Sequence, residues 1–216
     1  MTQINILDTA KRTILSESKA IEKLADLLTP DFVSAVEAIL SMKGRLVVTG
    51  IGKSAIIAQK IVATLNSTGT PSLFLHASEA IHGDLGMVQA GDVVICISKS
   101  GNSPEIKVLA PIIERFGNIL IGMTGNTHSF LAQQSDLVLD TTVTEEACPL
   151  NLAPTSSTTA QLVMGDALAV TLMEMKQFTA EDFAKYHPGG ALGKKFLLRV
   201  KDMLANTLKP QLIPEP

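Results

Sequence analysis

The sequence predicts an α/β protein with a five-stranded parallel sheet covered by helices on both faces. From Arg45 onward, short apolar runs of strand length alternate with segments of helical pattern. Strands that are apolar throughout are typical of a parallel sheet buried on both sides. A hydrophobic fraction of 46% fits such a well-filled core. We expect a flavodoxin-like strand order, with ligands at the carboxyl ends of strands near the point where the order reverses.

The segment before the sheet predicts a helical hairpin over residues 1–44. Apolar residues recur at helical spacing between residues 4 and 28, with charges on the other side. Thr29 can cap a second helix that has Pro30 at its first position, and Gly44 can end it. We expect the long first helix to contact a partner subunit; packing on its own sheet is the alternative.

The strands and helices of the expected domain, residues 45–204, follow from the change of pattern. The five strands are expected at 46–49, 72–75, 93–97, 119–123 and 137–140. Helices are expected at 54–66, 104–116 and 156–176, and a last one from Ala191. Residues 205–216 are rich in proline and are expected to form a frayed tail.

Composition excludes several classes of partner. The net charge of -3 and the absence of tryptophan argue against a nucleic-acid-binding surface. No apolar run is long enough to span a membrane, and no signal peptide is recognisable. The cysteines, Cys96 and Cys148, form no disulfide or zinc pattern. We expect a cytoplasmic protein with no membrane partner.

The stretch from Asp92 to Glu105 is the one around which the chain is organised. A buried strand leads into a polar loop, and a helix follows with Ser103 as cap and Pro104 at its first position. The loop consists of hydroxyl, amide and glycine residues: Ser98, Ser100, Gly101, Asn102 and Ser103. Free N–H groups at a helix start bind anions. A well-capped helix with an ordinary polar loop is an equally good reading of this segment alone.

Two further helix starts have a similar character. Thr49-Gly-Ile-Gly-Lys-Ser54 follows the first strand, but it lacks the earlier glycine of a P-loop, and His76 replaces the acidic residue of a dinucleotide site. Gly50 and Gly52 nevertheless allow a ligand to approach closely. Residues 155–159 are Thr-Ser-Ser-Thr-Thr. Two hydroxyl-rich starts and one Gly-x-Gly-Lys turn indicate a phosphorylated ligand.

Several titratable side chains could carry protons. His82 precedes Gly-Asp in a loop and is a candidate proton carrier, although most loop histidines are structural. Only one of Glu145 and Glu146 can face a site, because neighbours in extended chain point in opposite directions. His187 lies on a Pro-Gly-Gly turn, where a structural role and a functional one are equally good interpretations.

Taken together, these motifs resemble the D-arabinose-5-phosphate isomerases, a family of the sugar isomerase (SIS) domain group. The resemblance covers roughly residues 10–204 and is most specific at 146–159 and 187–193, which contain Glu-Ala-Cys-Pro and His-Pro-Gly-Gly-Ala-Leu-Gly. Many members continue into a pair of CBS domains. Because this chain stops at Pro216, it resembles a short form without CBS regulation.

The resemblance implies reversible conversion of D-ribulose 5-phosphate to D-arabinose 5-phosphate through a cis-enediol, supplying octulosonic acid (Kdo) synthesis. The positions that match the family's catalytic residues are Lys53, Glu105, Glu146 and His187. As hypotheses, Glu146 would move the C1/C2 proton and Lys53 would stabilise the enediolate oxygen. His187, with His82 as rival, would handle hydroxyl protons, and Glu105 would hold sugar hydroxyls.

The resemblance also implies the binding groups and the assembly. Substrate would be bound by residues of the polar loops: Gly50, Gly52, Ser54, Gly69, Thr70, His82, Ser98, Ser100, Gly101, Asn102, Ser103, Thr155, Ser156, Ser157 and Thr158. No cofactor is required, and His76 matches a position where a divalent, zinc-like ion would bind and inhibit. A homotetramer with sites at subunit contacts is expected, and a nucleotide sugar is a candidate inhibitor.

Two alternatives from other classes stay open. A non-catalytic sensor of sugar phosphates would keep the serine loops but could lack the proton carriers. Another SIS isomerase would keep the chemistry and act on a different phosphosugar.

Overall fold

The computed structural model describes residues 5–190 and contains a parallel sheet of five strands in the order β2-β1-β3-β4-β5. The strands are β1 (Leu46–Gly50), β2 (Ser72–His76), β3 (Val93–Ser98), β4 (Ile119–Thr124) and β5 (Leu137–Asp140). The predicted fold class and flavodoxin-like order are therefore confirmed. The helix expected from Ala191 and the tail at 205–216 lie outside the described residues.

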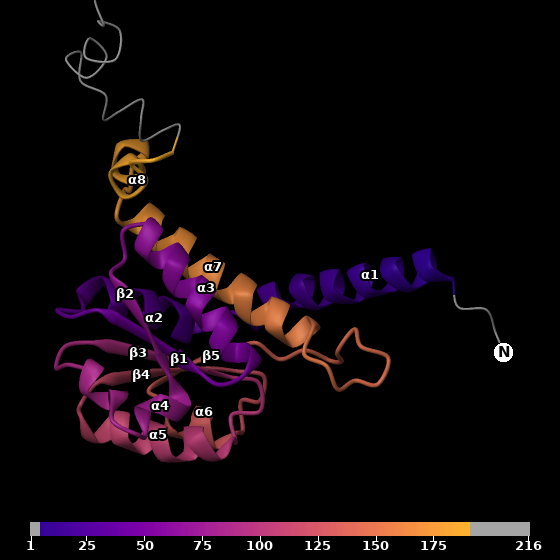
Figure 1. The fold of residues 1–216 in the computed structure, drawn as a ribbon, viewed down its shortest axis with the longest axis horizontal. Helices are drawn as coiled ribbons and strands as arrows, with labels where there is room; N and C mark the ends of the chain where they lie inside the picture. Colours follow the sequence, from indigo (N-terminus) through magenta and orange to yellow (C-terminus); the bar gives the residue numbers. More distant parts are fainter. Residues whose placement is uncertain (1–4, 191–216) are drawn as a thin grey trace, which may run out of the picture.

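Helices cover both faces of this sheet (Figure 1). In chain order they are α1 (Ile6–Leu24), η1 (Ala25–Leu27), α2 (Pro30–Ser41), α3 (Lys53–Ser67), α4 (Ala77–Ala80), η2 (Asp84–Met87), α5 (Pro104–Arg115), α6 (Phe130–Gln134), α7 (Ser156–Met175) and α8 (Ala180–Tyr186). One face carries α2, α3 and α7, and the other carries α4, α5 and α6. Among residues 5–190, no helix is both long and apolar enough to cross a membrane.

The two faces of the sheet have separate hydrophobic cores. In β1, Leu46 and Val48 pack into the core beneath α3 and α7, whereas Val47 packs into the core beneath α5. The central strand β3 is buried at all six positions, because it has strands on both sides and helices on both faces. This double burial explains the uninterrupted apolar runs of the sequence.

Helices α3 and α7 run side by side in the same direction. Ile61 and Gly165 meet about two turns from the start of each helix, and Lys60 forms an ion pair with Asp166 beside them. A Cβ atom at position 165 would lie 2.4 Å from side-chain carbons of Ile61, so glycine permits this close approach. The pairing brings the N-termini of α3 and α7 together at the carboxyl edge of the sheet (Figure 1).

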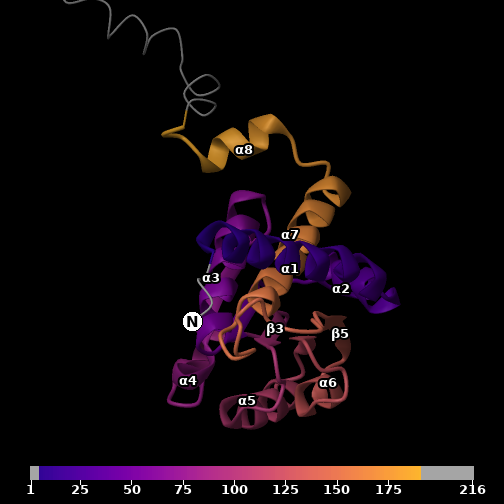
Figure 2. The same ribbon diagram turned by 90° about the vertical axis from the view of Figure 1, so that its right-hand side faces the viewer.

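The N-terminal helices α1 and α2 each pack on the sheet domain. Helix α1 packs on α7, and α2 packs on β5 and α7. Asp31 in the first turn of α2 accepts a 2.8 Å hydrogen bond from the Val138 backbone N–H of β5. Thr29 stands at the N-cap of α2, but its side chain makes no capping bond, so that part of the prediction is wrong. Figure 2 shows α1 running across α7.

The α3–α7 contact predicts a specific coupling. Gly165→Ala should lower the free energy of unfolding by about 1–3 kcal/mol, because the added methyl group overpacks against Ile61. In an Ile61→Ala background the same substitution should cost much less. Urea unfolding of the four proteins measures this coupling.

Gly86→Ala is the matched control, because a Cβ at residue 86 meets nothing within 4 Å. If Gly165→Ala lowered the free energy of unfolding equally in the wild-type and in the Ile61→Ala background, the proposed contact would be contradicted.

Candidate active site

The carboxyl edge of the sheet gathers most of the residues that the sequence singles out. The loops after β1, β2, β3 and β5 all open there, because the strands are parallel. The helices α3, α5 and α7 begin at this edge. The predicted residues that the structure places along it are Gly50, Gly52, Lys53, Ser54, His76, His82, Ser98, Ser100, Gly101, Asn102, Ser103, Glu105, Glu146, Thr155, Ser156, Ser157 and Thr158.

Several buried hydroxyl groups at this edge have no hydrogen-bond partner in the described chain. They are Thr49 Oγ1, Ser103 Oγ, Thr141 Oγ1 and Ser156 Oγ. Ser103 occupies the predicted N-cap position of α5 and Pro104 follows at the first helical position, but the Ser103 hydroxyl makes no capping bond. Because buried polar groups are normally satisfied, these four hydroxyls are exceptions, and they lie at the edge where the polar loops meet.

The loop after β3 has a fixed backbone. Ser98 Oγ accepts from the Gly101 N–H at 3.1 Å, and Ser100 Oγ accepts from the Asn102 N–H at 3.3 Å. Gly101 has a φ of +64°, and a Cβ there would lie 2.1 Å from Ser129 Oγ. Glycine is therefore required for the turn between β3 and α5.

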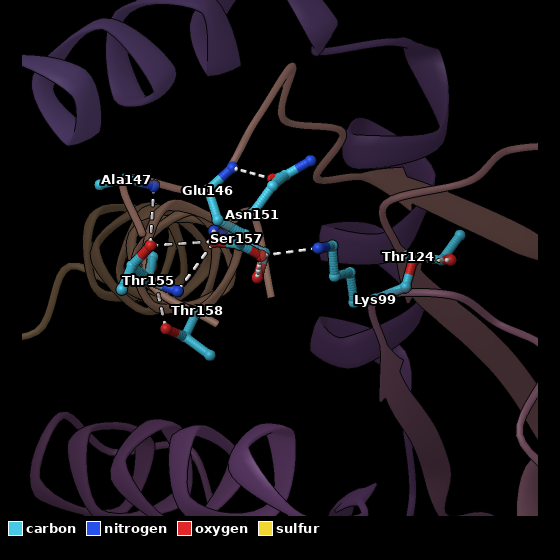
Figure 3. Close-up of polar contacts among 8 residues, drawn as sticks. All are labelled: Lys99, Thr124, Glu146, Ala147, Asn151, Thr155, Ser157 and Thr158. Atoms are coloured by element: carbon cyan, nitrogen blue, oxygen red, sulfur yellow. Dashed lines mark hydrogen bonds and ion pairs between the residues drawn. The ribbon is translucent and has the colours of Figure 1, made fainter. Parts of the chain in front are cut away.

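Glu146 is the most enclosed charged group of the site, with a side chain that is 0% exposed. Its Oε2 accepts from Thr155 N–H at 2.8 Å, from Thr155 Oγ1 at 3.1 Å and from Ser157 N–H at 3.1 Å. Its Oε1 accepts from Ser157 Oγ and from Lys99 Nζ, the latter at 2.7 Å. Figure 3 shows the two donor groups on opposite sides of the carboxylate, one from α7 and one from Lys99. Glu146 is buried and Glu145 is exposed, which agrees with the expectation that only one of the two acids faces inward.

These donors decide the charge of Glu146. Burial alone would raise the pKa of the carboxyl group, but hydrogen bonds from Lys99, Ser157 and the Thr155 and Ser157 backbone lower the pKa to about 2. The positive end of the α7 dipole acts in the same direction. Glu146 is therefore a carboxylate at any physiological pH, and it replaces a side-chain cap at the start of α7.

Lys99 is the site residue that sequence reasoning missed. Its ammonium pairs with Glu146, while its side chain remains 47% exposed. Its backbone is fixed, because the Lys99 carbonyl accepts from the Gly125 N–H at 3.0 Å. The sequence feature that could have identified Lys99 is its position in a Ser-Lys-Ser loop at the end of a buried strand.

Lys53 and Glu105 occupy the first turns of α3 and α5. Gly52, with a φ of +58°, makes the turn that leads from β1 into α3. Lys53 is exposed and Glu105 is half-buried. Among the described residues, neither side chain makes a hydrogen bond or an ion pair, so both are free to meet a ligand.

His76, at the end of β2, and His82, in the segment that follows, have different surroundings. His76 ends β2 edge-on to Phe74, and its Nδ1 is buried without a hydrogen-bond partner. His82 is exposed after α4. Within residues 5–190, no three His, Cys, Asp or Glu side chains come together to hold a metal ion. A single imidazole does not make a zinc site, so one described chain does not fit the divalent ion expected at His76.

Three predicted site residues lie at the other end of the molecule. Gly69, with a φ of +84°, packs beneath the ring of Phe178. Thr70 is buried and accepts a 2.7 Å bond from Lys176. His187 stacks on Phe183 with a ring-centroid distance of 3.8 Å. Both ribbon views place α8, which precedes His187, beyond the C-terminal end of α7.

The separation between these groups is set by α7. A helix of 20 residues spans about 30 Å, and Glu146 contacts its first turn whereas His187 follows its far end. Gly69 and Thr70 precede β2 and therefore lie at the amino edge of the sheet. The structure does not bring Gly69, Thr70 and His187 together with the serine loops within one chain.

The chain matches known proteins over most of its length. The SIS domain family model matches residues 39–171. Arabinose 5-phosphate isomerase KdsD of Pseudomonas aeruginosa is 54% identical over 201 residues, which are 93% of this chain and 62% of that protein. KdsD of Escherichia coli K12 is 53% identical over 194 residues, 90% of this chain and 59% of that protein. The chain thus spans about three fifths of the length of these curated relatives.

Solved structures share the same fold. The c3406 protein of E. coli CFT073, in complex with arabinose 5-phosphate, has a TM-score of 0.83 and 45% identity, with 87% of this chain and 100% of that chain covered. A putative phosphosugar isomerase involved in capsule formation from Bacteroides fragilis has a TM-score of 0.81 and 39% identity, covering 86% and 99%. By the family model and by these relatives, the chain belongs to the SIS domain family.

Proposed function

We propose that the protein interconverts D-ribulose 5-phosphate and D-arabinose 5-phosphate, and so supplies octulosonic acid synthesis. The observation that carries this proposal is the meeting of three helix N-termini with a buried, ionised Glu146 at one sheet edge. The names of the KdsD relatives and of the arabinose 5-phosphate complex agree with it. The reaction moves a proton between neighbouring carbons and requires no redox cofactor.

The phosphate group of the substrate fits the hydroxyl-rich helix starts. The free N–H groups and dipoles at the starts of α3 and α5 favour an anion at the carboxyl edge, whereas two N–H groups at the start of α7 are already bonded to Glu146. The unpartnered hydroxyls of Ser103 and Ser156 can donate further hydrogen bonds. A nucleotide sugar has the same phosphate and hydroxyl groups, which supports the proposal that it competes for this site.

The proton transfer requires a base and a group that stabilises the enediolate. Lys53 provides a cation at the edge of the site for the enediolate oxygen. Glu146 is proposed as the proton shuttle, although a carboxylate with a pKa of about 2 is a weak base until some of its donors are withdrawn. Glu105 is half-buried nearby along the same edge and is the alternative base.

His187 can join this chemistry only from another subunit, since it lies beyond the far end of α7. We therefore propose a homo-oligomer, a tetramer by family resemblance, in which His187 completes the site of a neighbouring copy. Helix α1 offers a surface for such contacts, because Ile6, Leu7, Ile14 and Leu15 are all more than half exposed. A groove of about 980 Å³ lies between α1 and residues 142–151.

A test of the function is direct. Purified protein is mixed with D-ribulose 5-phosphate, and the products are followed by ¹³C NMR. The proposal expects D-arabinose 5-phosphate to appear until equilibrium is reached. Formation of a different aldose phosphate would assign the chain to another phosphosugar.

A non-catalytic sensor is the second candidate. The capping role of Glu146 favours it, because a carboxylate that stabilises the start of α7 would be useful without any catalysis. Tight binding of arabinose 5-phosphate without turnover in the same NMR experiment would support the sensor.

Ser103→Ala should weaken substrate binding while leaving the stability of the fold nearly unchanged. Its hydroxyl makes no capping bond, so the free energy of unfolding should change by less than about 0.5 kcal/mol. The KM should rise with little change in kcat, because phosphate contacts exist in both ground and transition states. Ser129→Ala is the control: Ser129 Oγ does cap α6, and its loss should cost about 1 kcal/mol without changing KM. An unchanged KM for Ser103→Ala would place the phosphate elsewhere.

Glu146→Gln should reduce both activity and stability. Activity should fall by about 10²- to 10⁴-fold if Glu146 carries the proton. Its folded pKa is lowered, so its stabilising contribution of about 3 kcal/mol is present above the ordinary carboxyl pKa and disappears as pH falls towards 2. The stability difference between wild type and variant, measured by urea unfolding, should therefore shrink between pH 5 and pH 2.

Glu145→Gln, which changes the exposed neighbouring acid, is the matched control and should change neither activity nor stability. Full activity in Glu146→Gln would move the proton transfer to Glu105.

Mixed oligomers test whether His187 serves a neighbour. Lys53→Met and His187→Ala should each be nearly inactive alone. Unfolding and refolding them together should restore activity, because some sites then combine an intact Lys53 with an intact His187 from another chain. Activity that stays absent in verified mixed oligomers would show that both residues act within one chain.

A further inference from the structure

Lys99 differs from the other groups that bind Glu146. Four of the five donors belong to Thr155 and Ser157 at the start of α7: two are backbone N–H groups fixed by the helix, and two are hydroxyls on short side chains that stay close to the carboxylate. The fifth is the Lys99 ammonium, at the end of a flexible stem that is half exposed. Lys99 is the donor that can move while the rest of the contact stays intact.

The backbone of Lys99 places it within the proposed phosphate site. It lies between Ser98 and Ser100, and its carbonyl is anchored to Gly125. The lysine stem can therefore turn between two positions, one towards Glu146 and one towards the hydroxyls of its own loop.

Charge decides which position is favoured. In the free protein Glu146, with a single negative charge, is the acceptor that the structure shows. A phosphate monoester carries nearly two negative charges at pH 7 and offers three strong acceptor oxygens. An ammonium group acts as a mobile point charge and binds phosphate well. A phosphate bound at the start of α5 would compete with Glu146 for Lys99.

We propose that Lys99 exchanges between Glu146 in the free protein and the phosphate of the bound sugar, and that this exchange makes Glu146 a stronger base. The inference rests on the proposed function. Lys99 binds the phosphate directly and affects the proton transfer only through Glu146, and it keeps its own proton throughout. When Lys99 leaves, Glu146 loses one positive neighbour and one hydrogen bond. Glu146 then takes the proton from C1 of ribulose 5-phosphate and returns it to C2, while the proton of the O1 hydroxyl moves to O2 through the group that handles hydroxyl protons.

The test measures the protonation of Glu146 directly. The whole chain is labelled with ¹³C at the glutamate carboxyl carbons, and Glu146→Gln identifies the signal. The signal is titrated from pH 7 to pH 1.5, a range that includes the pKa of about 2 in the free protein. The titration is done with and without arabinitol 5-phosphate, which has the phosphate and hydroxyls but no carbonyl to isomerise. Calorimetry gives the Kd of the same ligand.

The exchange predicts a result for each of four proteins. In wild type, the ligand should raise the midpoint of the Glu146 titration by about one pH unit or more. In Lys99→Met, the midpoint should be raised already without ligand, the ligand should add little, and the Kd should rise about tenfold. Lys99→Arg should behave more like wild type. Lys107→Met, which changes an exposed lysine on α5, should not differ from wild type.

A wild-type midpoint that stays unchanged when the ligand binds would overturn the exchange, as would an unchanged Kd in Lys99→Met. A ligand that does not bind at all would also overturn it. Turnover of ribulose 5-phosphate by the same samples is a separate readout. Absent turnover in a protein whose Glu146 responds to the ligand would overturn the isomerase proposal and leave the exchange standing.

Discussion

The contact between the Glu146 carboxylate and the first turn of α7 is the interaction on which the arrangement of the site depends. It satisfies backbone N–H groups that an uncapped helix leaves unpaired, and it keeps a buried carboxylate ionised. Through Lys99, the same carboxylate joins the loop before α7 to the loop after β3. Gly165 lets α7 lie close to α3, so both helices begin at the same edge of the sheet.

The parallel sheet then limits where chemistry can occur. Each strand delivers its following loop to the same edge, and α3, α5 and α7 point their positive ends there. Phosphate binding and proton transfer can thus share one edge within a single chain. The amino edge has another role: Lys176 and Phe178 hold Thr70 and Gly69, and α8 follows. This division of the molecule supports a site that two copies complete together.

The sequence was sufficient for the sheet, its order and the main helices, because doubly buried strands are apolar throughout. Helices α4, α6 and α8 were not predicted, since 4, 5 and 7 residues are too few to establish a period. Glu146 was predicted to face inward, but its partner Lys99 was not identified, because an ion pair between residues 47 positions apart leaves no local pattern. Ser103 and Thr29 stand at the predicted N-cap positions, but their hydroxyls make no capping bond, which residue type and position alone could not show. The sequence motifs that contain His187 and Glu146 gave no information on how far apart these residues lie in the folded chain.

The central claim is that a group at the carboxyl edge moves a proton between C1 and C2 of a ribulose 5-phosphate enediol. Running the reaction in D₂O tests this claim most directly. The account predicts arabinose 5-phosphate that carries solvent deuterium at C2, because a carboxylic acid formed at the enediol stage exchanges its proton with solvent before returning it. Arabinose 5-phosphate formed without any deuterium, from ribulose 5-phosphate that also gains none, would contradict it.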